Sequence, residues 1–165
     1  MGSFDQSAAV ALAQQSRGPA WLQAFREANQ AAWLVSPWPD RRTEDWKYTT
    51  LAPLAEVDYL RFSPVTGTDF EPSQYQVEGL DCHRLVFVNG ELAPELCQLQ
   101  PLADGTSLVR FSEADAQQQS LISEHLGTLA GGSSNPFVAL NGSWLEDGVM
   151  LHVTADEPLP LHIVH

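Results

Sequence analysis

The chain has 165 residues and a formal net charge of −13, because 21 aspartate and glutamate residues outnumber 8 lysine and arginine residues. Its 44% hydrophobic and 18% charged residues are typical of a globular protein with a core of its own. No apolar run approaches the roughly 18 residues that a membrane span needs, and an acidic chain is poorly suited to bind nucleic-acid phosphates. These properties argue against a disordered chain, a membrane protein and a nucleic-acid-binding protein.

The first sixty residues predict helices followed by an irregular connector. A stretch rich in Ala, Leu and Gln predicts a short helix over residues 5–16. Pro19 suits the first position of a second helix, in which large side chains recur at helical spacing. The predicted buried stripe of this helix consists of Trp21, Leu22, Phe25, Ala28, Asn29, Ala32 and Trp33. Pro37 and Pro39 then end the helical pattern.

The middle of the chain predicts strands and a helix. Residues 84–88 form a β-rich run, and the Asn-Gly pair at residues 89–90 favours a tight hairpin turn after it. Another strand is expected over residues 107–111. Residues 112–115 resemble a capping box, which predicts a helix that ends at Gly127.

The last part of the chain predicts a helical turn and two further strands. The helical turn begins at residues 135–136, where Asn precedes Pro, and a turn at residues 147–148 leads into a strand over residues 149–153. The final strand covers residues 161–165, at the very end of the chain. Because an apolar terminal strand leaves an unpaired edge, we expect a chain cut within a strand and concentration-dependent dimers through that edge.

Motifs for enzymatic chemistry are missing from the sequence. It contains neither a G-x-S-x-G nucleophile elbow nor a glycine-rich phosphate loop. Cys82 and Cys97 are separated by fourteen residues, which matches no zinc or redox spacing and favours free thiols in a cytoplasmic protein. We therefore expect no catalytic residues and no enzymatic activity.

Two binding functions remain as alternatives. His152 and His162 lie opposite the apolar residues of their strands, so pairing of these strands would create a metal platform, with His165 as a further candidate. Structural metal sites normally need four ligands, which makes surface histidines the simpler interpretation and a metal site improbable. A carbohydrate-binding module would instead use exposed Trp38 and Trp144 as its stacking platform.

The densest local pattern is RTEDWKYT, at residues 42–49. We interpret this motif as mainly structural, with Arg42 pairing with Glu44 or another carboxylate, and with Trp46 and Tyr48 packing beneath the loop. Its conspicuous members are Arg42, Glu44, Trp46, Lys47, Tyr48 and Thr49.

This motif, followed by LAPL at residues 51–54, resembles the R-x-E-x-W-[KR]-Y-T…L signature near the start of SufD and its relatives. These proteins form the SufB/SufD family of the SUF iron-sulfur cluster assembly system. Three further segments agree in order: LVFVNG at residues 85–90, FVALN at residues 137–141 and DG at residues 147–148. The chain is thus similar to the N-terminal part of SufD, with a fragment of the paralogue SufB as the alternative.

The resemblance implies an α+β fold in three parts. A helical subdomain over residues 1–60 and a mixed strand and helix region over residues 61–142 would form an N-terminal accessory domain. Residues 143–165 would then be the truncated start of a right-handed parallel β-helix.

The resemblance also implies an accessory role in a scaffold, with no activity for this part alone. SufB and the ATPase SufC are the expected partners of the longer protein, and neither nucleic acid nor membrane is expected. The complete complex would handle an iron-sulfur cluster, ATP on SufC and reduced flavin. None of these cofactors is assigned to a residue of this chain.

Overall fold

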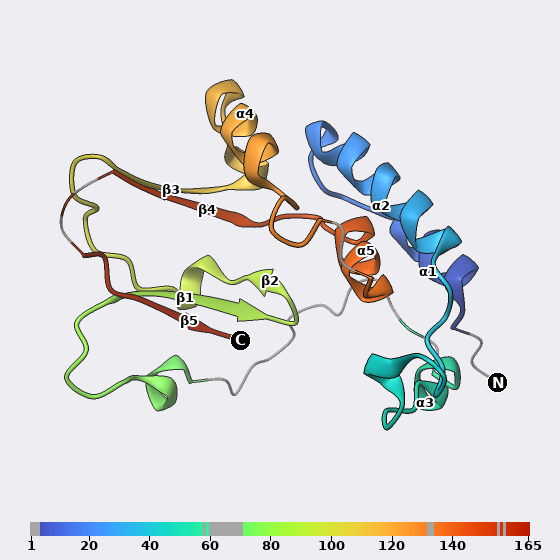
Figure 1. The fold of residues 1–165 in the computed structure, drawn as a ribbon. Helices are drawn as coiled ribbons and strands as arrows, with labels where there is room; N and C mark the ends of the chain where they lie inside the picture. The colour runs from blue at the N-terminus through green and yellow to red at the C-terminus, as the bar shows by residue number, and fades with distance from the viewer. Residues whose placement is uncertain (1–3, 58, 60–70, 132–133, 155, 157) are drawn as a thin grey trace. The chain divides into compact units, whose positions relative to one another are not determined.

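The structure is a computed structural model that describes residues 4–57, 59, 71–131, 134–154, 156 and 158–165 (Figure 1). The chain divides into two compact units that interleave along the sequence. The first unit is Met1–Arg61 with Ala114–Asp147, and the second is Phe62–Glu113 with Gly148–His165. The α-helices belong to the first unit and the strands to the second, which confirms an α+β fold.

The predicted division into an accessory domain and the start of a β-helix stays a prediction. The expected boundary between its helical and mixed parts, at residues 60 and 61, lies outside the described residues.

The first unit is built around three helices, α1 (Gln6–Ala13), α2 (Gln23–Val35) and α5 (Pro136–Ser143). It also contains α3 (Ala52–Ala55) and α4 (Ala116–His125). The predicted helix near the N-terminus is confirmed in a shorter form. It begins after Asp5, whose side chain accepts a hydrogen bond from the Ala8 amide and caps α1. α5 begins as expected, with Asn135 as its N-cap and Pro136 in its first turn.

The buried stripe of α2 differs from the predicted one. Leu22, in the short 3₁₀ turn before the helix, and Trp33 are buried as expected, but the alanines at positions 28 and 32 are exposed. Arg26 is buried instead, with guanidinium nitrogens 3.4 Å from the Pro19 carbonyl oxygen and 3.5 Å from that of Leu145. Periodicity assigns small apolar residues to the core, whereas an arginine becomes buried where carbonyl groups meet its donors.

An aromatic cluster forms the core of this unit. Trp33 is fully buried, and its ring centroid lies 5.8 Å from that of Trp38 and 5.9 Å from that of Phe137. Phe4 extends the cluster with edge-on contacts to Trp38 at 6.5 Å and Trp144 at 6.1 Å. Edge-to-face geometry at these separations is favourable for aromatic rings. Ala9 of α1 is buried in the same cluster, which therefore joins α1, α2 and α5.

The indole N–H groups of this cluster also connect the helices. Trp33 Nε1 donates to the Gln6 carbonyl oxygen at 3.1 Å, and Trp144 Nε1 donates to the Ala9 carbonyl oxygen at 2.9 Å. Each indole is therefore packed along its ring and satisfied at its polar atom.

In the second unit, a three-stranded sheet has the order β2-β1-β5. β1 (His83–Val88) pairs antiparallel with β2 (Glu91–Leu92) and parallel with β5 (Leu161–Val164). Asn89 and Gly90 connect β1 to β2 with φ values of 52° and 84°. These positive angles confirm the predicted hairpin, because an Asn-Gly pair tolerates them at both central positions of a tight turn.

The second sheet pairs β3 (Thr106–Arg110) with β4 (Val149–Val153) in antiparallel orientation. The register runs from Thr106 opposite Val153 to Arg110 opposite Val149. Antiparallel pairing of β4 differs from what successive turns of a parallel β-helix require, and the β-helix stays a prediction.

The start of α4 corrects another prediction. Residues 111–113 form a 3₁₀ turn, and the capping box consists of Asp115 and Gln118 rather than residues 112–115. The Asp115 carboxylate accepts from the Gln118 amide, and the Gln118 side chain accepts from the Asp115 amide, both at 2.9 Å. The predicted capping box at residues 112–115 overlaps a second one at residues 115–118. Only the second has its last residue, Gln118, inside the helix. The predicted end at Gly127 is confirmed by a φ of 79°.

Gly142 allows α2 and α5 to approach closely. A Cβ atom at this position would lie 2.4 Å from Asn29 Cγ and 2.5 Å from Asn29 Oδ1. Alanine is normally preferred over glycine inside a helix, so the close contact accounts for the glycine.

We expect Gly142→Ala to lower the free energy of unfolding by about 1–3 kcal/mol, because the added methyl group overpacks the contact between α2 and α5. Adding Asn29→Ala should recover most of this loss, since it removes the colliding side chain. Urea unfolding of both single variants and the double variant measures the coupling. Additive losses would contradict the close approach.

Candidate functional site

The RTEDWKYT motif contains one well-packed side chain. Its central residues form a 3₁₀ turn over Glu44–Trp46, and the Trp46 ring centroid lies 5.3 Å from that of Phe137 in α5. Trp46 is half-buried, and its ring packs against the helical unit through this contact.

The remaining expectations for this motif are wrong in detail. Tyr48 is 92% exposed, so it does not pack beneath the loop. Arg42 is also exposed, its backbone amide donates to Asp40 Oδ1 at 2.7 Å, and in the described part of the chain no ion pair joins it to Glu44. Exposed ion pairs contribute little, so nothing compensates for ordering two long side chains in a short turn.

Lys47 and Tyr48 together form an exposed feature next to the packed tryptophan. Lys47 Nζ lies 5.5 Å from the centroid of the Tyr48 ring, within the range of a cation–π interaction. Thr49 is exposed as well. The mainly structural role of the motif stays a prediction, because only Trp46 among its members is packed.

The structure separates the two histidines proposed as a metal platform. His152 lies on β4 opposite Ser107, whereas His162 lies on β5 opposite Arg84. The pairing on which the platform would depend is therefore not formed, because each strand has a different partner. Within the described ranges, no group of three or more His, Cys, Asp or Glu side chains could hold a metal ion. His165 instead stacks on Phe87, with ring centroids 5.1 Å apart.

The tryptophans proposed as a carbohydrate platform are likewise used elsewhere. Trp38 and Trp144 are half-buried and both contact Phe4 in the aromatic cluster. A stacking platform needs exposed ring faces, so their expected exposure is wrong and the carbohydrate-binding alternative loses its basis.

Both cysteines are free thiols, as expected. Cys97 Sγ accepts from the Val86 amide at 3.3 Å and lies 3.3 Å from the Ala93 carbonyl oxygen, to which its thiol donates. Cys82 is half-buried and lines a pocket of the second unit.

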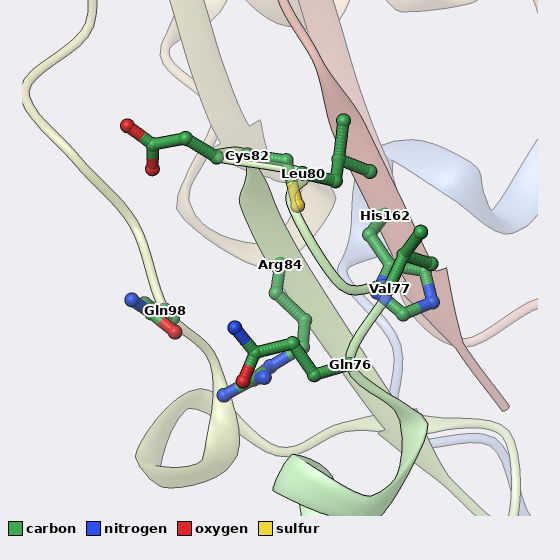
Figure 2. A pocket seen from close by; sticks show the side chains of 8 residues that line it. Gln76, Val77, Leu80, Cys82, Arg84, Gln98 and His162 are labelled. Atoms are coloured by element: carbon green, nitrogen blue, oxygen red, sulfur yellow. The ribbon is translucent and has the colours of Figure 1, made fainter.

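This pocket was missed by the sequence analysis. Its lining includes Arg84 and Gln98 in addition to His162 (Figure 2). These residues come from three distant segments, and none belongs to a recognisable motif. Only strand pairing brings them together, so no local signal in the sequence indicates the pocket.

No helix in the described ranges combines the length and the apolar character that crossing a membrane requires.

We expect Trp46→Ala to lower the free energy of unfolding by about 2 kcal/mol, somewhat below the cost of removing a fully buried aromatic side chain. Arg42→Ala and Tyr48→Ala should each stay within about 0.5 kcal/mol of the parent, because both side chains are exposed. Chemical unfolding followed by tryptophan fluorescence and circular dichroism compares the three variants. Equal destabilisation by Trp46→Ala and Arg42→Ala would contradict this account.

Comparison with known proteins supports the resemblance carried by the motifs. A family model described as the SufBD protein N-terminal region matches residues 4–163. A Synechocystis sp. protein named as an iron-sulfur cluster assembly SufBD family protein is 25% identical over 128 residues. The match covers 76% of this chain and 28% of that relative. Because the family model covers nearly the whole chain, the chain belongs to the SufBD N-terminal region family.

Proposed function

We propose that this chain is the N-terminal region of a SufD-like scaffold component in the SUF system for iron-sulfur cluster assembly. The observation that carries the proposal is the family match over residues 4–163, which includes the RTEDWKYT motif. The similar Synechocystis protein is itself named as an iron-sulfur cluster assembly protein. A paralogous SufB origin fits the same match, and the choice of SufD rests on the order of the four motifs.

The proposed role of this region is accessory and non-enzymatic. The helices close around their own aromatic cluster, and the motif leaves Lys47 and Tyr48 exposed beside the packed Trp46. An exposed lysine and tyrosine on an ordered turn are suited to contact a protein partner, since tyrosine is enriched in interfaces. Cluster assembly, ATP binding on SufC and any reduced flavin belong, in this proposal, to other parts of a cytoplasmic complex.

The proposed link to a right-handed β-helix rests on the sheet of the second unit. Among the strands that the structure describes, β5 lies at the edge of its sheet and pairs in parallel with β1, so its other side can accept a further strand. A parallel β-helix would use that edge for chain continuation.

The partners offer a test of the proposal. We expect the tagged 165-residue chain to recover neither SufB nor SufC, whereas the longer gene product that contains it recovers both. The partner that is recovered distinguishes the two paralogues, because a SufD-like protein should pair with SufB and not with SufD. Recovery of SufD in place of SufB would assign the chain to the paralogue. Recovery of no SUF component by the longer product would overturn the scaffold proposal.

The edge strand also predicts self-association of the 165-residue chain. Ile163 on β5 is 52% exposed, and an apolar edge strand favours pairing with a second copy. Sedimentation should therefore show concentration-dependent dimers, and Ile163→Lys should abolish them by placing a charge on the edge. Tyr48→Lys is the matched control, since it adds a lysine at an exposed position on a turn. A parent chain that stays monomeric at high concentration would contradict the prediction.

A further inference from the structure

A row of polar side chains crosses the three-stranded region of the second unit. Arg84 in the middle of this row lies opposite His162 on β5. On the other side of β1 it forms an isolated bridge with Gln98, with backbone N···O distances of 2.7 and 2.9 Å. Residues directly opposite each other on paired strands project to the same face, so the three side chains share one face.

The segment before β1 turns this row into a pocket. The hollow is small, with a volume of about 50 Å³, and it opens to solvent. Figure 2 shows Arg84 reaching towards Gln76, with Gln98 and His162 on either side of it. The complete lining is Gln76, Val77, Leu80, Asp81, Cys82, Arg84, Gln98 and His162.

The arginine of this pocket lacks a partner at a buried atom. Arg84 Nε is buried and has no hydrogen-bond partner, and the hydrogen bonds of this residue within the described structure are those of its backbone. The guanidinium group cannot lose its charge in a protein. A buried donor on a permanent cation is unfavourable unless an acceptor reaches it. The pocket therefore contains a hydrogen-bond donor that lacks an acceptor.

Neighbouring side chains indicate what kind of acceptor fits. The amides of Gln76 and Gln98 and the ring of His162 offer further donors around the guanidinium. Asp81 is the one carboxylate in the lining, and its Oδ1 already accepts a hydrogen bond from the Gln100 side chain. Arg84 and Asp81 cancel in charge, which favours a monoanion over a dianion such as phosphate.

We propose that this pocket binds a small organic carboxylate. A carboxylate matches the planar fork of a guanidinium and supplies two acceptor oxygens for its N–H groups. Because the chain carries a net charge of −13, long-range attraction does not concentrate anions here, and recognition depends on these short contacts. This proposal does not depend on the role of the chain in cluster assembly.

NMR titration of the 165-residue chain with sodium acetate tests the proposal, because the Arg84 Nε–H group gives its own signal. The signal should shift saturably, together with the backbone amides of residues 83–85 and 161–163. Sodium chloride at equal ionic strength should produce no saturable shift, and inorganic phosphate should bind more weakly than acetate.

Arg84→Gln should weaken acetate binding roughly tenfold or more, as expected for loss of a charge-assisted hydrogen bond. Arg84→Lys keeps the charge but loses the planar fork of donors, and it should weaken acetate binding similarly. It replaces Arg84→Gln in the test if the glutamine variant fails to fold. Arg42→Gln is the matched control, because it removes an exposed arginine in the other unit and should leave the affinity unchanged.

Three results would overturn the proposal. The first is an Arg84 signal that acetate leaves unshifted or shifts only linearly, as expected if water alone occupies the pocket. The second is phosphate binding at least as tight as acetate binding. The third is unchanged acetate affinity in a folded Arg84→Gln or Arg84→Lys variant.

Discussion

The burial of Trp33 is the interaction on which the helical unit depends. Its indole donates to Gln6 at the start of α1, and the Gln6 side chain donates back to the carbonyl oxygens of Trp33 at 2.7 Å and Ser36 at 2.6 Å. The same ring contacts Phe137 of α5, which in turn contacts Trp46. The position of the RTEDWKYT motif therefore follows from a chain of ring contacts that begins at one buried tryptophan.

This arrangement explains why the RTEDWKYT motif contains both packed and exposed residues. Trp46 attaches the turn to α5, and this attachment leaves Lys47 and Tyr48 facing solvent. A turn anchored by one aromatic side chain can present its neighbours in a defined position at little entropic cost.

The second unit depends on a different constraint, the pairing choices of β1. This strand has the turn to β2 built into its sequence, but it also receives β5 from the other end of the chain. The long-range pairing places His162 opposite Arg84 and separates it from His152. The pairing of β5 with β1 therefore prevents the two histidines from forming a metal platform, and it creates a pocket rich in hydrogen-bond donors.

Local features of this protein were determined by the sequence itself. The hairpin at Asn89 and Gly90, the cap of α5 and the end of α4 at Gly127 each depend on the backbone preferences of neighbouring residues. Only the tertiary structure decided which residues far apart in sequence meet. Burial of Arg26 required the carbonyl group of Leu145, which is far away in the sequence, as well as that of nearby Pro19. The pocket around Arg84 required a parallel strand from the end of the chain. Hydrophobic periodicity and capping rules describe interactions within a few residues, whereas these contacts depend on the packing of whole elements.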